Sequence, residues 1–189
     1  MERLQFLLAK LQHHELDYFD EFYELTHKKV YFMAYSLLRD EASSEDIVQE
    51  VYMKVLEKPK RIKLDGNINS YLMEMSKNIT LNYLKKKQRS SIEYVEEISG
   101  EDDPDITDLK DTEVFQLMKK KLSDKEFTIV ILHVVNDLKH DEISKLLNIP
   151  LGTVTWTYNN ALKKLTKGGN KDEWHWKENL SSWTSPTLE

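Results

Sequence analysis

Residues 141–165, DEISKLLNIPLGTVTWTYNNALKKL, have the layout of a helix-turn-helix that reads DNA. Such a motif needs a small residue where its helices cross and a turn residue that tolerates left-handed geometry. Ser144 and Asn148 meet these needs, and Pro150 suits the first turn of the second helix. The apolar anchors are Ile143, Leu146, Leu147, Ile149, Val154, Tyr158, Ala161, Leu162 and Leu165. The alternative interpretation is a plain helical hairpin.

The charge of this segment is unusual for a protein that binds nucleic acid. Residues 153–162, which should lie against DNA, contain no Lys or Arg, and the whole chain has a net charge of −6. Most of the negative charge is local, because residues 91–113 contain ten acidic side chains and one basic one. Blocks of like charge are usually solvated and disordered. We therefore predict an acidic flexible linker at this point in the chain.

The elements that precede the linker are predicted to be helices. Apolar residues recur at steps of three and four over residues 17–39, 44–57 and 68–88. Ser43 followed by Asp46 resembles a capping box at the start of the second helix. Few Gly and Pro residues, five and four, also favour long helices over a protein with many turns.

Helical signals resume after the linker, near Glu113. Ser123 and Glu126 predict a second capping box, and two shorter helices follow at about 140–147 and 151–166. We predict an all-α fold of two small helical domains joined by the acidic linker, with a C-terminal helix-turn-helix domain (winged-helix-like, four-helix). The predicted boundaries are 1–90 for the first domain, 91–112 for the linker, 113–167 for the second domain and 168–189 for a tail that contains three of the four Trp residues.

Several classes of protein are disfavoured by composition. No apolar run approaches the roughly 20 residues of a membrane helix, and the N-terminus lacks the cleavage site of a signal peptide. With no cysteine there is neither a disulfide nor a thiolate site, which fits a cytoplasmic protein. The six His are scattered and no nucleophile–base pair is evident, so we predict no enzyme activity, no metal and no cofactor.

Three motifs in order resemble one family. HDEISKLLNIPLGTVTWTYNNALKKL is similar to the C-terminal DNA-binding domain of sigma-70 family sigma factors, closest to the small extracytoplasmic-function (ECF) group. ASSEDIVQEVYMKVLEK resembles their polymerase-binding helix, and NINSYLMEMSKNITLNYLKKKQR resembles their promoter-melting helix. The resemblance spans about residues 15–166. It implies a transcription initiation factor that binds core RNA polymerase, directs it to certain promoters and helps to open the DNA.

The resemblance also implies residue roles in the N-terminal half. Asp46, Gln49 and Glu50 would contact the polymerase clamp, although a solvated polar face is the default for such residues. The loop DGNINS would form a pocket for an unpaired base of the −10 element. Tyr71 stands where the family often has Trp, and a core role for it is equally open. The predicted −10 residues are Asn67, Ser70, Tyr71, Lys77, Asn78, Asn82, Lys85, Lys86, Lys87 and Arg89.

The −35 helix departs from the family pattern, which has Lys or Arg at several positions between Val154 and Lys163. Asn can pair with adenine and Thr methyls can touch thymine methyls, so a neutral helix can still read bases. Few phosphate contacts predict weak intrinsic binding, which tethering to polymerase would offset. The predicted −35 residues are Thr153, Thr155, Trp156, Thr157, Asn159, Asn160, Lys163 and Lys164.

Some alternatives stay open on the sequence. The acidic linker could imitate nucleic acid in a basic polymerase channel, or it could be a solvated tether. The tail could fold back on the second domain or bind a partner, and an anti-sigma factor is a further partner that the residues do not decide. The main rival to a sigma factor is a sigma-like interaction module or regulator whose DNA-reading helix has decayed.

Overall fold

The computed structural model of the chain describes residues 2–89 and 113–166. Every regular element in these two ranges is a helix, and neither range contains a strand. The chain divides into two compact units near residue 100, which are described one at a time. The predicted linker at 91–112 and the tail at 168–189 lie outside the described residues.

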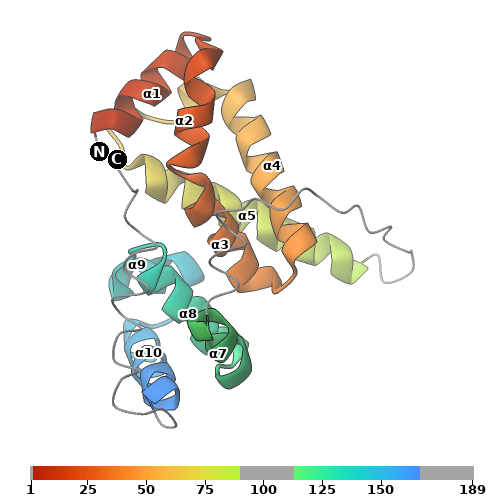
Figure 1. Cartoon of the computed structure of the whole chain (residues 1–189), viewed down its shortest axis with the longest axis vertical. Coiled ribbons are helices and arrows are strands. Elements are labelled where there is room, and N and C mark those ends of the chain that lie inside the picture. Colours follow the sequence, from red (N-terminus) through yellow and green to blue (C-terminus); the bar gives the residue numbers. More distant parts are fainter. Residues whose placement is uncertain (1, 90–112, 167–189) are drawn as a thin grey trace. The chain divides into compact units, whose positions relative to one another are not determined.

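The N-terminal unit is built around three packed helices (Figure 1). Its elements are α1 (Glu2–Gln12), the 3-10 turn η1 (Leu16–Tyr18), α2 (Phe19–Glu24), α3 (His27–Leu38), α4 (Glu41–Glu57), the 3-10 turn η2 (Pro59–Arg61) and α5 (Ile68–Arg89). Helix α3 packs against both α4 and α5, which also contact each other. Residues 30–36 of α3 are all buried, as expected for the central helix of a bundle.

The expected single helix over 17–39 is wrong, because the chain leaves helical geometry at Thr26 (φ −129°, ψ −24°). The Thr26 hydroxyl donates to the carbonyl of Phe22 at 2.7 Å and lies 2.6 Å from the hydroxyl of Tyr52. Short polar side chains compete in this way with the helical ladder. The apolar period continues across the break, so sequence periodicity alone could not reveal it.

The start of α4 also differs from the prediction. The N-cap is Asp40, whose carboxylate accepts from the backbone N–H of Ser43 at 2.8 Å, and the helix begins at Glu41. Ser43 therefore lies inside the first turn, where its hydroxyl meets that of Tyr83 in α5 at 2.9 Å. Asp and Ser are equally good N-caps, and the tertiary contact with α5 decides between them.

The C-terminal unit holds four helices in its described residues. They are α7 (Glu113–Lys121), α8 (Asp124–Val134), α9 (His140–Leu147) and α10 (Leu151–Thr166), and no β-wing accompanies them in this range. Helix α10 packs against α7, α8 and α9. The apolar face of α8 is almost completely buried, from Phe127 to Leu132.

The predicted turn and capping box of this unit are confirmed. Asn148 ends α9 in the left-handed region (φ 54°, ψ 49°), and Ser144 donates its hydroxyl to the carbonyl of Ile149 at 2.6 Å. Ser123 and Glu126 cap α8 reciprocally, with the Ser123 N–H donating to the carboxylate at 2.9 Å. The turn at Asn148 sets the direction in which the chain leaves α9, and the capping box sets where α8 begins.

Candidate nucleic-acid interface

Helix α4 presents an acidic and amide-bearing surface to solvent. Asp46, Gln49 and Glu50 are all exposed, opposite the buried stripe that begins at Ile47. Glu50 forms an ion pair with Lys54 at 2.8 Å, one turn along the helix. Met53 lies on the same side and is 62% exposed, which the sequence reasoning did not single out. The surface thus combines carboxylates with one large apolar side chain, a combination suited to a protein partner.

Two adjoining hollows lie between the end of α4, the loop around η2 and helix α5 as far as Asn82. The first has a volume of about 370 Å³ and the second about 410 Å³. Both are lined by Arg61, Ile62, Tyr71 and Glu74. Five of the residues predicted from sequence line one or both hollows: Asn67, Ser70, Tyr71, Asn78 and Asn82.

Basic residues of the loop complete these hollows. Lys58 and Arg61 line the first, and Arg61 and Lys63 line the second. The sequence reasoning missed them, although the run KPKRIK at residues 58–63 carries the signal. Tyr71 is half-buried, so it is a wall residue of both hollows rather than a core residue. Together the aromatic ring, amides and cations can take an unstacked base and its phosphate.

Several of the predicted −10 residues in and beside α5 make contacts of their own. Asn67 caps the helix, its side-chain oxygen accepting from the Ser70 N–H at 3.0 Å. The side chain of Lys77 is only 14% exposed and pairs with Glu74 at 3.5 Å, so it does not lie along the exposed face as expected. Lys85, Lys86 and Lys87 are exposed near the end of the helix. The side chain of Arg89 lies outside the part of the chain that the structure describes.

The exposed side of α10 is neutral and partly apolar. Trp156 is 67% exposed, Leu151 in the first turn is 48% exposed, and Asn159 is exposed one turn beyond Trp156. Thr153 and Asn160 are half-buried. Lys163 is the first exposed cation along the helix. An apolar and amide surface of this kind can meet base edges but offers little to phosphates.

Thr157 corrects one expectation, because it is only 4% exposed and cannot face DNA. It lies three residues after Val154 and four before Ala161, both fully buried. These spacings put Thr157 on the buried stripe of the helix. The remaining −35 residues stay predictions.

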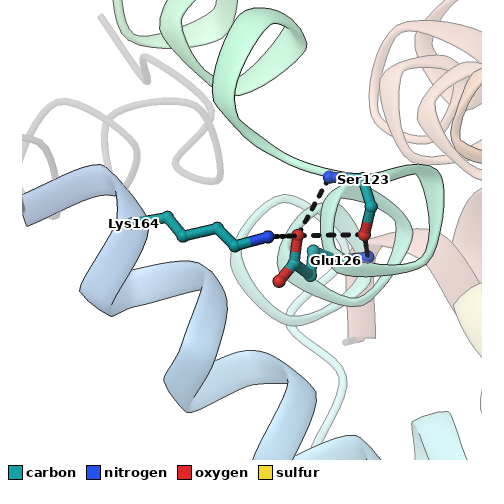
Figure 2. A network of polar contacts seen from close by, with 3 residues as sticks. All are labelled: Ser123, Glu126 and Lys164. Atoms are coloured by element: carbon teal, nitrogen blue, oxygen red, sulfur yellow. Dashed lines mark hydrogen bonds and ion pairs between the residues drawn. The ribbon is translucent and has the colours of Figure 1, made fainter.

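Lys164 is held by a buried carboxylate. Its ammonium lies 2.7 Å from Glu126, whose carboxylate also accepts from the N–H and the hydroxyl of Ser123 (Figure 2). Burial alone would raise the pKa of Glu126, but the hydrogen bonds from Lys164 and Ser123 outweigh it and lower the pKa below its usual value. Lys164 therefore ties α10 to α8, and this bond competes with any phosphate contact that it makes.

Two histidines, His133 near the end of α8 and His140 at the start of α9, meet beside Tyr158 of α10. The rings of His133 and His140 are 4.9 Å apart, and both contact the ring of Tyr158. The Nδ1 of His140 lies 3.2 Å from the hydroxyl of Thr155. Burial and the neighbouring His133 lower the pKa of His140. No group of three or more potential metal ligands occurs in the described parts of the chain.

None of the helices in the described ranges combines the length and apolarity needed to cross a bilayer.

The chain matches two family models in order: Sigma-70 region 2 over residues 22–90 and Sigma-70 region 4 over residues 112–165. Together these matches cover well over half of the chain.

Curated proteins with similar sequences span nearly the same length. The ECF RNA polymerase sigma factor SigW of Bacillus subtilis is 23% identical over 167 residues, which is 80% of this chain and 88% of that protein. SigK of Mycobacterium tuberculosis, also an ECF sigma factor, is 24% identical over 170 residues, or 86% and 91% of the two chains.

A solved structure has the same fold. The sigma factor RpoE of Bartonella quintana, crystallised with the anti-sigma factor NepR, is 18% identical, with a TM-score of 0.56 over 80% of this chain and 96% of that one. The two matched regions, their order along the chain and the similar proteins all indicate the same family. The chain belongs to the sigma-70 family and is an ECF RNA polymerase sigma factor, a protein that initiates transcription and is not an enzyme.

Proposed function

We propose that the two units divide promoter recognition between them. Residues 1–90 bind the polymerase clamp and the −10 element, and residues 113–167 bind the −35 element, with 91–112 as the connecting linker. The observation that carries this proposal is the set of five predicted residues around the two hollows between α4 and α5. An isolated polar helix face would not place aromatic, amide and basic groups around one concavity.

The polymerase contact is assigned to the exposed side of α4. Asp46, Gln49 and Glu50 meet a basic surface of the clamp, and Met53 packs against its apolar part. Partly apolar, partly charged patches are typical of interfaces in which charges steer the encounter and apolar anchors hold the complex.

The −10 element is assigned to the hollows and to the exposed end of α5. An unpaired base enters beside Tyr71, the amides of Asn78 and Asn82 contact its edge, and Arg61 meets the neighbouring phosphate. Lys85, Lys86 and Lys87 follow the backbone of the strand. Stacking on an aromatic ring is worth about 1–3 kcal/mol per base, so Tyr71 is expected to carry a large part of this affinity.

The −35 element is assigned to α10, with Trp156 and Asn159 towards bases and Lys163 towards phosphate. The next lysine, Lys164, is already paired with Glu126. The helix therefore supplies little electrostatic affinity, and polymerase compensates by holding the domain near the promoter. The absence of Lys and Arg over 153–162 also favours a second candidate, in which α10 has lost DNA recognition and serves as a protein-binding surface.

We place the protein in the cytoplasm with polymerase, and an anti-sigma factor is a further partner suggested by the Bartonella complex.

The test is reconstitution of holoenzyme with core polymerase and transcription from a promoter selected from random duplexes. Scrambling the −10 element should abolish transcription, and scrambling the −35 element should reduce it measurably. Loss with the first change and none with the second would reject the −35 assignment in favour of the second candidate. Transcription that is indifferent to both changes would reject the proposal as a whole.

A further inference from the structure

Helix α1 precedes residue 22, where the match to region 2 begins, yet it is part of the fold of the N-terminal unit. Leu7, Leu8 and Leu11 are 0–1% exposed, and the helix packs against α2, η1 and η2. The contact with η2 brings α1 to the loop that joins α4 to α5. This loop also forms a wall of both hollows.

Gln12, the last residue of α1, bonds directly to this loop. Its side-chain amide donates to the backbone carbonyl of Pro59 at 3.2 Å and to that of Ile62 at 2.8 Å. Pro59 is the first residue of the turn η2 and Ile62 is the residue after its end, and both are buried. The two bonds span 47 and 50 residues of sequence, so they join elements that no local pattern connects.

The bonded carbonyls belong to the segment that shapes the hollows. Ile62 and its neighbour Arg61 line both of them, while Gln12 lines neither. Gln12 thus holds the loop without lining either hollow. A loop that carries part of a binding site gains affinity when its bound conformation is already set, because ordering it no longer costs free energy on binding.

We propose that Gln12 is a positioning residue for capture of the unpaired −10 base, acting by fixing the loop over residues 59–62. This inference rests on the proposed role of the hollows. It adds that α1, outside the matched region, contributes to promoter discrimination. Gln12 does not touch DNA; it acts through the backbone of Pro59 and Ile62.

A simple stabilising role is the competing explanation, and the experiment separates the two. Full-length variants Gln12→Met and Gln12→Glu remove the amide donors at similar side-chain length, and Met and Glu are good helix formers. Gln5→Met, on the same helix, is the matched control. Each holoenzyme is tested on the selected promoter and on a version with an abasic site in place of the captured −10 base. The measured quantity is the ratio of open-complex formation on the two, which does not depend on the active fraction.

Loss of two hydrogen bonds should lower this ratio about fivefold to tenfold in both Gln12 variants. Gln5→Met should keep the wild-type ratio. A wild-type ratio in the Gln12 variants, or an equal fall in Gln5→Met, would overturn the inference. If Gln12→Met does not fold, Gln12→Asn, which draws the amide back by one methylene, carries the test with the same expected loss.

Tyr71→Ala distinguishes failure of the inference from failure of the proposed function. If Tyr71→Ala lowers the ratio and the Gln12 variants do not, the hollows capture the base and only the role of Gln12 is rejected. If neither position affects the ratio, the proposed −10 site is rejected and the inference with it.

Discussion

The two surfaces assigned to DNA use different physical means. The −10 surface on α5 and its loop has cations at Lys58, Arg61 and Lys63, more at the helix end, and a concavity with an aromatic wall. The −35 surface on α10 has no Lys or Arg over residues 153–162. Its most exposed large apolar side chain is Trp156, and Lys164, further along the helix, is paired with Glu126.

The difference suggests which contact supplies affinity and which supplies discrimination. Phosphate contacts give most of the strength and salt dependence of DNA binding, whereas base-edge contacts carry sequence information. The N-terminal unit has groups for phosphate contacts and for base contacts. The C-terminal unit has mainly groups for base contacts, so its binding to DNA should depend on polymerase holding it near the promoter.

The largest expected effect comes from weakening the contact between α4 and core polymerase. The double change Asp46→Lys and Glu50→Lys reverses two exposed charges on α4, and like charges facing each other cost several kcal/mol. We expect core polymerase affinity to fall about 100-fold or more, measured by fluorescence anisotropy of labelled protein. Both residues are exposed, so circular dichroism should stay native. Native folding with unchanged affinity would contradict the assignment of α4 to the clamp.

The second prediction tests the cationic end of the −10 surface. Changing Lys85, Lys86 and Lys87 together to Ala should reduce the log–log salt slope of holoenzyme binding to single-stranded −10 DNA by about 2, at about 0.7 per phosphate contact. The matched control is Lys125→Ala, an exposed lysine of the other unit. An equal reduction in the control would mean that general charge, and not this surface, sets the slope.

The third prediction concerns Lys164, whose ammonium is paired with Glu126. Glu126→Gln weakens the cap of α8 and the bond to Lys164, which should lower the free energy of unfolding by about 1–2 kcal/mol. The freed Lys164 can then reach a phosphate, so the salt slope for −35 duplex DNA should steepen by about 0.9. Chemical denaturation and anisotropy measure the two effects. Stability that falls without a steeper slope would show that Lys164 does not lie near the DNA backbone.

The pH dependence of this stabilisation follows from the lowered pKa of Glu126. A carboxyl group whose folded-state pKa is lowered stabilises the fold above its unfolded-state value, near 4.5, and this stabilisation is lost as pH falls through the lower folded-state pKa. The difference in unfolding free energy between wild type and Glu126→Gln should therefore be constant above about pH 6 and shrink below pH 4.5. A difference that grows on acidification would contradict the ion pair.

The smallest expected effect tests the apolar character of the −35 surface. If Trp156 contacts a thymine methyl, replacing that thymine by deoxyuridine should weaken −35-dependent transcription about fourfold, the value of one buried methyl group. Trp156→Ala should remove the sensitivity to this replacement. Leu162→Ala, a half-buried position on the same helix, is the comparison for general damage to α10. Sensitivity that survives in Trp156→Ala would assign the methyl contact to another residue.

Local signals in the sequence were enough for much of the C-terminal unit. The capping box at Ser123 and Glu126, the left-handed turn at Asn148 and the bounds of α9 and α10 depend on interactions within a few residues. The order of the motifs was enough to predict the family, because two family regions in the right order are far more specific than a single helix-turn-helix.

Other features depend on contacts between distant residues, which local patterns do not encode. The break at Thr26 depends on Tyr52, and the choice of Asp40 over Ser43 as cap depends on Tyr83. The burial of Thr157 depends on which side of α10 meets α7, α8 and α9. Gln12 reaches a loop 47 residues away. The sequence by itself determined the family, the helical character of the described residues and the elements of the C-terminal unit, through motif order, short-range propensity and capping. Only the tertiary structure decided which side chains face solvent, because burial and long-range hydrogen bonds are set by packing.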